Sequence, residues 1–236
     1  MLPPLRSGGG PGRGPHTVIA VLDTIVQGFL LGGLYTPWSG TVRVAGADPT
    51  ALTDDQRRRA LGVVQQVVHL FRGTVYDNLT LGDGSVSRGA VQRAAAIAGA
   101  DAFIQILPQG YDTRLGGGIQ LSAGQRQLLA LARALVWEPA VLLLDEATAA
   151  VDSASEAAVR AAIRAAVMSS GRTVLTVAHR LATAQDADRV LVMEAGQIME
   201  MGPPEELIRR GGRFAALLEL EAAGWDWQSD GRSFRP

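Results

Sequence analysis

The run Val141–Leu144 is the feature that most constrains the fold of this 236-residue chain. Its four consecutive residues are all apolar, and Asp145 and Glu146 follow directly. A strand with one solvated face alternates between apolar and polar residues, whereas a central parallel strand is covered on both faces and is apolar throughout. The run therefore predicts a central strand of a parallel sheet. Its two acids would lie at the carboxyl edge, where ligands of such sheets bind.

Strand-like and helical patterns alternate around this run. The expected strands are 17–22, 41–44, 61–68, 141–144, 173–177, 189–193 and 197–200, and the expected helices are 24–31, 53–59, 122–136, 153–169, 203–210 and 214–222. Such alternation indicates an α/β fold with a largely parallel sheet. The pattern from 75 to 107 is helical, so we expect a helical lobe inserted into the α/β core.

The two ends of the chain lack this periodicity. Residues 1–16 are rich in Pro and Gly and contain no apolar stretch typical of a secretory signal, so we expect a flexible leader. We expect 224–236 to be a loose tail. The domain between them is expected over 17–223, with its core in 17–74 and 137–223 and its helical lobe in 75–136.

One apolar window, 18–35, approaches the length of a membrane span. It also contains Asp23, Gln27 and three glycines. These residues favour a short buried strand followed by a helix over a spanning helix.

The composition excludes several classes of chemistry. All 22 basic residues are Arg, and the chain contains neither Lys nor Cys. No step can therefore use a lysine ammonium, a thiol or a cysteine-bound zinc. A formal net charge of −1 gives no general attraction to nucleic acid or anionic lipid.

Asp145 and Glu146 are suited to phosphate chemistry. Hard cations such as Mg²⁺ take oxygen ligands, which Asp145 supplies. The neighbouring carboxylate of Glu146 can polarise a water for attack on a γ-phosphate. Taken alone, the pair fits equally well with two acids that end a strand and begin a turn.

The segment Leu121–Gln125 begins a predicted helix with Ser122, Ala123 and Gly124. Small residues at a helix N-terminus allow backbone N–H groups and a hydroxyl to reach a phosphate. The same residues also make an ordinary helix N-cap.

Several motifs in a fixed order resemble the ATP-binding cassette of ABC transporters. The segment LSAGQ at 121–125 resembles the signature motif, with Ala in place of one Gly, and VLLLDE resembles Walker B with its adjacent carboxylate. AAVD, ending at Asp152, resembles the D-loop, and His179 matches the switch histidine. VVQQVVHLFRGTVYDNL places Gln66 at the Q-loop glutamine, and this stretch and LPQGYDTRLGGG resemble exporters.

The resemblance implies a P-loop NTPase (RecA-like) core with an inserted α-helical subdomain and truncated N-terminal strands. It implies ATP and Mg²⁺ as ligands and ATP hydrolysis as the activity. Two cassettes would pair head to tail around ATP and drive a membrane domain at the cytoplasmic face of the cell membrane. The implied catalytic residues are Glu146, His179 and Gln66, the nucleotide-binding residues are Ser122, Ala123, Gly124, Gln125 and Asp152, and the Mg²⁺ ligands are Asp145 and Gln66.

The phosphate-binding loop departs from this family. A P-loop of the form GxxxxGK[ST] follows a strand and precedes a helix. Here the strand at 18–22 is followed by Asp23-Thr24-Ile25-Val26-Gln27-Gly28, without the glycines and without Lys. The Gly-rich stretch 8–14 precedes the strand and cannot replace the loop. We therefore expect impaired hydrolysis at this chain's own phosphate site.

Two alternatives remain open from the sequence. One is a non-catalytic partner that lends its signature segment to another cassette. The other is a truncated or damaged fragment that has lost the loop.

Overall fold

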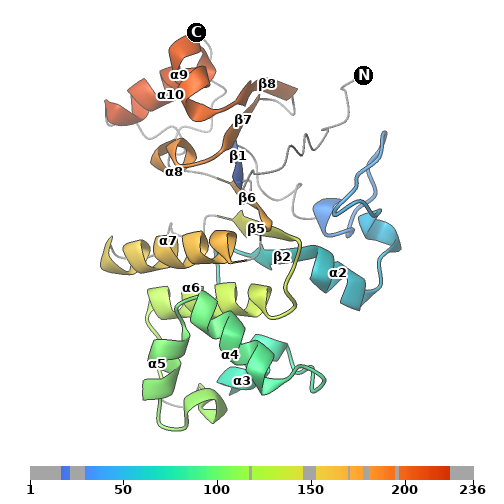
Figure 1. Ribbon diagram of the computed structural model, residues 1–236, viewed down its shortest axis with the longest axis vertical. Coiled ribbons are helices and arrows are strands. Elements are labelled where there is room, and N and C mark those ends of the chain that lie inside the picture. The colour runs from blue at the N-terminus through green and yellow to red at the C-terminus, as the bar shows by residue number, and fades with distance from the viewer. Residues whose placement is uncertain are drawn as a thin grey trace.

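A six-stranded sheet runs through the centre of the molecule in the order β2-β5-β6-β1-β7-β8 (Figure 1). The computed structural model describes residues 17–21, 30–116, 119–145, 153–169, 171–177, 181–194 and 197–223. The strands are β1 (Thr17–Val21), β2 (Leu61–Val64), β5 (Val141–Asp145), β6 (Thr173–Val177), β7 (Arg189–Glu194) and β8 (Gln197–Gly202). Every neighbouring pair is parallel except β7 and β8. The predicted α/β class with a largely parallel sheet is confirmed.

Strand β5 is a central strand, as its apolar run predicts. It pairs with β2 on one side and β6 on the other, and Leu142, Leu143 and Leu144 are all buried. Leu144 lies opposite both Val64 and Thr176, so the carboxyl ends of the three strands are aligned.

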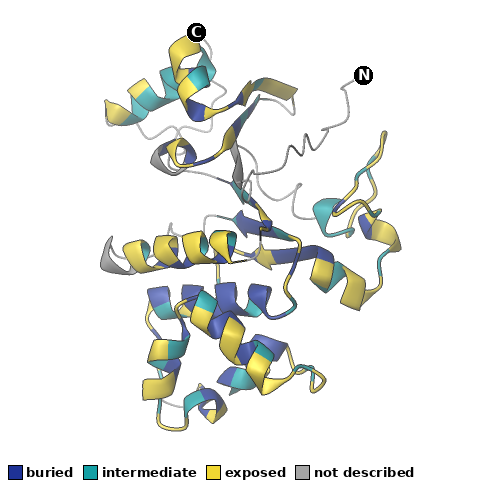
Figure 2. Ribbon diagram, in the orientation of Figure 1, coloured by how far each residue is buried: buried dark blue, intermediate teal, exposed yellow. Residues whose placement is uncertain are grey.

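A group of helices packs on one side of the sheet, at the bottom of Figure 1. They are α3 (Val75–Thr80), α4 (Arg88–Ile97), α5 (Asp101–Ile106), α6 (Ala123–Leu135) and α7 (Ser153–Met168). Leu79, Ile104 and Leu129 are buried among them, in one core cluster that continues into β5. Figure 2 shows this buried interior along α6, with exposed residues on the outer helices. The helical pattern predicted from 75 to 107 is confirmed, whereas the limits of the lobe stay a prediction.

The opposite end of the sheet carries a second, smaller core. Helices α8 (Leu181–Gln185), α9 (Pro204–Arg210) and α10 (Arg213–Ala222) lie there, at the top of Figure 1. Phe214 and Leu207 are fully buried in this cluster against Val190 of β7. Glu200 of β8 fixes the start of α10 because its carboxylate accepts the backbone N–H groups of Arg213 and Phe214.

Local cap signals are confirmed in several places. Helix α2 (Asp54–Ala60) begins with the predicted capping box between Thr53 and Gln56. A short 3₁₀ helix, η1 (Pro49–Ala51), precedes it.

The short strands β3 (Gly73–Thr74) and β4 (Arg114–Leu115), which the sequence did not predict, pair antiparallel at the edge of the helical group.

The prediction of a strand at 41–44 is wrong. Val44 makes only an isolated bridge to Ala47, across the predicted turn at Ala45 and Gly46. Both turn residues have positive φ, 50° and 85°. A strand needs a neighbour to accept its ladder of hydrogen bonds, and within the described residues no strand pairs with this segment.

The predicted strand at 61–68 is too long. The strand ends at Val64, and its neighbour β5 extends only one residue further, to Asp145. Gln65, Gln66 and Val67, which follow Val64, are exposed. The predicted helix at 24–31 lies mostly outside the described residues. Of the helices that the structure describes, none combines the length and apolarity needed to cross a membrane.

Candidate functional site

The carboxyl edge of the sheet brings together two of the predicted site residues. Asp145 ends β5, and Gln66 follows two residues after Val64 ends β2. Since Val64 pairs with Leu144, the Gln66 loop leaves the sheet beside Asp145. Asp145 is half-buried and Gln66 is exposed. A carboxylate and an amide oxygen at one accessible edge fit the oxygen ligands that Mg²⁺ prefers, and water can complete its shell.

Three predicted residues lie outside the described residues: Glu146, Asp152 and His179. The strands that lead to two of them are nevertheless neighbours. Glu146 directly follows Asp145, and His179 comes two residues after Val177, which is the register partner of Asp145. Within the described chain, no group of three His, Asp or Glu residues forms a metal cluster.

Strand β1 ends at the same edge. Ala20 pairs with Val177, and Val21 is the last residue of the strand. The chain therefore leaves β1 next to β6, one strand away from Asp145. This is the point where the sequence lacks the phosphate-binding loop, and residues 22–29 themselves lie outside the described part.

The signature segment forms a complete helix cap at the start of α6. Ser122 Oγ accepts the backbone N–H of Gln125 at 3.1 Å, and Gln125 Oε1 accepts the backbone N–H of Ser122 at 2.9 Å. Arg126 adds a hydrogen bond from its guanidinium to the carbonyl of Leu121 at 2.6 Å. The sequence predicted the helix start, and the reciprocal Ser122–Gln125 cap is the reason for it.

This cap leaves the first turn of α6 suited to an anion. α-Helix geometry gives the N–H groups of Ala123 and Gly124 no carbonyl within their own helix. Ser122 is exposed, and Gly124 is buried. The N-terminal end of a 13-residue helix also favours negative charge. The side chain of Gln125 is already engaged in the cap, so the hydroxyl of Ser122 and the two amides are the donors left for an anion.

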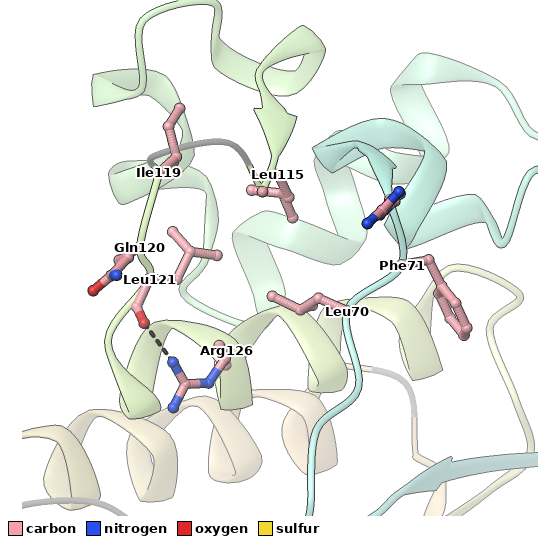
Figure 3. A pocket seen from close by; sticks show the side chains of 9 residues that line it. Leu70, Phe71, Leu115, Ile119, Gln120, Leu121 and Arg126 are labelled. Atoms are coloured by element: carbon pink, nitrogen blue, oxygen red, sulfur yellow. Dashed lines mark hydrogen bonds between the residues drawn. The ribbon is translucent and has the colours of Figure 1, made fainter.

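A hollow of about 340 Å³ lies between the signature segment and the loop that follows Gln66 (Figure 3). Its lining residues are Leu70, Phe71, Arg72, Leu115, Gly116, Ile119, Gln120, Leu121 and Arg126. Aliphatic side chains form much of the wall, and Arg72 and Arg126 add positive charge. Sequence reasoning missed this feature because its residues come from three separate stretches without a shared motif.

Known ABC transporter proteins are similar to this chain over most of its length. The model of the ABC transporter family matches residues 29–149, which is slightly more than half of the chain. P-glycoprotein 14 of Caenorhabditis elegans is 44% identical over 193 residues, which cover 81% of this chain and 14% of that protein. The mycobactin import ATP-binding/permease protein IrtB of Mycolicibacterium thermoresistibile is 43% identical over 199 residues, or 84% of this chain and 34% of that protein.

A solved structure supports the same assignment. A bacterial Atm1-family ABC exporter with ATP bound superposes with a TM-score of 0.76 at 38% identity. The match covers 88% of this chain and 37% of that one. The chain thus spans a minor part of each of these proteins. It belongs to the ABC transporter family, as a nucleotide-binding domain of the exporter type with a P-loop NTPase fold.

Proposed function

We propose that this chain is an ATP-binding domain that couples ATP binding and hydrolysis to transmembrane transport, and that it hydrolyses ATP weakly or not at all at its own phosphate site. Members of the family bind ATP with Mg²⁺, and the solved exporter that the chain resembles has ATP bound. The observation that carries the proposal is a contrast between two phosphate-binding motifs. Ser122 caps α6 with both reciprocal bonds. The sequence after β1 instead has Asp23 two residues beyond Val21, in a chain without Lys.

The physical argument concerns charge. Phosphoryl transfer depends on preorganised N–H groups and a lysine that stabilise the β- and γ-phosphates. A carboxylate at position 23 repels phosphate instead, and no Arg lies between 17 and 42 to offset it. The proposed roles of the remaining residues are Mg²⁺ binding by Asp145 and Gln66, water activation by Glu146, contact with the γ-phosphate by His179, and nucleotide binding by Asp152.

The direct test compares the purified chain with its Glu146→Gln variant in an ATPase assay with Mg²⁺. We expect both rates to lie at or close to that of the protein-free blank. A turnover of about 1 s⁻¹ or faster that Glu146→Gln abolishes would refute the proposal, because it would show a working site without the loop.

The second candidate function makes the chain a non-catalytic partner. Ser122, Ala123 and Gly124 would contact the γ-phosphate held by the intact P-loop of another cassette. The cap geometry at Ser122 favours this reading, because the N-terminus of α6 keeps amides available for an anion. One complete ATP site would then form in each heterodimer.

A matched pair of variants tests this candidate. Ser122 and Ser87 are both exposed N-cap residues that accept a backbone N–H, at 3.1 and 3.2 Å. Each is replaced by Arg, and the chain is mixed with a purified exporter cassette that has an intact P-loop. Ser122→Arg should lower the turnover of that cassette, and Ser87→Arg should leave it unchanged. Equal effects of the two variants would count against the idea.

We also propose that a transmembrane domain contacts the hollow and holds the chain at the cytoplasmic face of the membrane. The hollow offers apolar surface and two arginines, which suit a short segment with apolar and acidic side chains. Ile119→Glu should weaken co-purification with a membrane domain. The control is Ile106→Glu, at a residue that is 85% exposed on α5 and does not line the hollow.

A remaining alternative is that the loop has been lost from a longer reading frame. Resequencing the locus, including the stretch upstream of Met1, tests it. A P-loop encoded directly after the β1 codons, or an open frame for membrane helices upstream, would favour a damaged or truncated fragment over a specialised partner.

A further inference from the structure

Arg133 of α6 connects the signature helix to the segment that follows Gln66. Its Nη1 donates to the carbonyl of His69 at 3.0 Å, and its Nε donates to the carbonyl of Asn78 at 2.9 Å. Its Nη2 reaches the Oδ1 of Asn78 at 3.3 Å. The guanidinium also lies 5.3 Å from the ring centre of Phe71. One side chain therefore contacts the 69–71 segment and α3 together.

Asn78 of α3 completes the connection from the other side. It is 1% exposed. Its Oδ1 accepts the backbone N–H of Phe71 at 2.8 Å, and its Nδ2 donates to the carbonyls of Phe71 and Thr74 at 2.9 and 3.0 Å. Both polar atoms of the amide therefore hold the backbone of this segment.

The segment 69–74 links two parts of the proposed site. It begins three residues after Gln66, which lies at the carboxyl edge with Asp145. Leu70, Phe71 and Arg72 also line the hollow beside the signature segment. Arg133 lies on the same helix that Ser122 caps, so its hydrogen bonds form a joint between the segment after Gln66 and that helix.

The joint needs an arginine for a geometric reason. A guanidinium presents five donors in a planar fork and can stack on an aromatic ring, whereas an ammonium is a compact point charge. Burial lowers the pKa of Arg133 from its ordinary value. Within the described residues no ion pair involves Arg133, so carbonyl and amide oxygens solvate the cation. Losing the guanidinium would remove this donor from the carbonyl of buried Asn78, while Asn78 Oδ1 would keep the backbone N–H of Phe71.

We propose that Arg133 is a positioning residue that fixes the 69–74 segment to the signature helix, so that the Gln66 loop and Ser122 move as one body. The functional consequence rests on the proposed function above. Arg133 touches neither nucleotide nor reacting water in this role, and acts through His69, Phe71 and Asn78.

Hydrogen exchange on the full chain, read by mass spectrometry, tests the joint without any ligand. Arg133→Lys keeps the charge and removes the fork. We expect peptides that contain the Phe71 amide to exchange about tenfold faster or more, while peptides from β5 keep their protection, because the opening is local. The matched control is Leu129→Ala, which removes a fully buried side chain from the same helix. It should speed exchange of the globally protected amides without a preference for Phe71.

The proposal is overturned if Arg133→Lys leaves the Phe71 peptide unchanged, or if it speeds all peptides as Leu129→Ala does. Phe71→Leu provides a second variant if Arg133→Lys does not fold. It removes only the ring beneath the guanidinium, and we expect a smaller local increase, about two- to threefold. An unchanged Phe71 peptide in this variant would also count against the joint.

A second readout separates this proposal from the proposed function. In the mixture with an intact-P-loop cassette, Arg133→Lys should lower kcat more than it raises KM for ATP, because it disturbs alignment of the signature helix. If Ser122→Arg has no effect there, the partner role fails. The hydrogen-exchange result then still tests, by itself, whether Arg133 holds the 69–74 segment. If Ser122→Arg acts but Arg133→Lys does not, the coupling part of the proposal is wrong.

Discussion

Gly62→Ala should destabilise this domain, because β2 passes very close to α6. A Cβ built on Gly62 would lie 2.8 Å from the carbonyl oxygen of Ala134, 2.8 Å from Cγ of Pro139 and 3.2 Å from Cδ1 of Leu142. Two of these neighbours cannot rotate away, since one is backbone and the other a proline ring. The strand and the helix would have to move apart to admit a methyl group.

The expected size follows from two opposing effects. Overpacking a well-packed core costs about 1–3 kcal/mol. Replacing Gly by Ala also removes conformational freedom from the unfolded chain, which offsets about 0.4–1 kcal/mol. Because the clash is with fixed atoms, we expect a net loss of roughly 1–2 kcal/mol in the free energy of unfolding.

Urea unfolding of the two proteins measures this loss as a lower midpoint with an unchanged slope. Gly89→Ala on α4 is the control, because the nearest atom to its built Cβ is a flexible Arg93 nitrogen at 3.6 Å. It should stabilise the domain, by up to about 0.5–1 kcal/mol. If Gly62→Ala were as stable as the parent while Gly89→Ala gained stability, the close approach of β2 and α6 would be refuted.

Three further predictions concern the helix cap, the smaller core and acid stability. Ser122→Ala should cost about 1 kcal/mol in urea unfolding, because the N–H of Gln125 loses its acceptor, and Ser122→Asp should restore most of it. Phe214→Ala should cost about 3–5 kcal/mol and lower the melting temperature, because the ring is fully buried beside Leu207. Hydrogen bonds from the backbone and hydroxyl of Thr74 lower the pKa of Asp77. Its stabilising contribution is therefore present above the unfolded-state pKa and lost as pH falls below about 4, and Asp77→Asn should flatten that acid limb in a stability–pH profile.

Local patterns predicted much of the fold. The apolar run before Asp145 indicated a strand covered on both faces, and β5 has a parallel neighbour on each side. Thr53 with Gln56 and Ser122 with Gln125 marked helix starts, because a capping box is complete within four residues and needs no distant partner. The assignment to a family came from motif order, which the comparisons confirm.

Longer-range features could not be predicted in this way. The segment at 41–44 has strand-like residues, but no described strand pairs with it, and β-propensity without a partner does not make a strand. The hollow beside the signature segment and the Arg133–Asn78 joint join residues far apart in the chain. A single sequence without repeats or covariation contains no signal for such contacts.

The amino-acid sequence by itself determined what chemistry is available. A chain with 22 Arg and no Lys cannot build a lysine-containing phosphate loop in any fold. It also determined the local starts and ends of many helices and strands, because those depend on neighbours within a turn. Only the tertiary structure decided that the chain leaves β1, β2 and β5 at one edge, and that Arg133 holds the segment after Gln66 against the signature helix. Those arrangements depend on packing between distant residues, where the burial of apolar side chains and the need to satisfy buried polar groups select the partners.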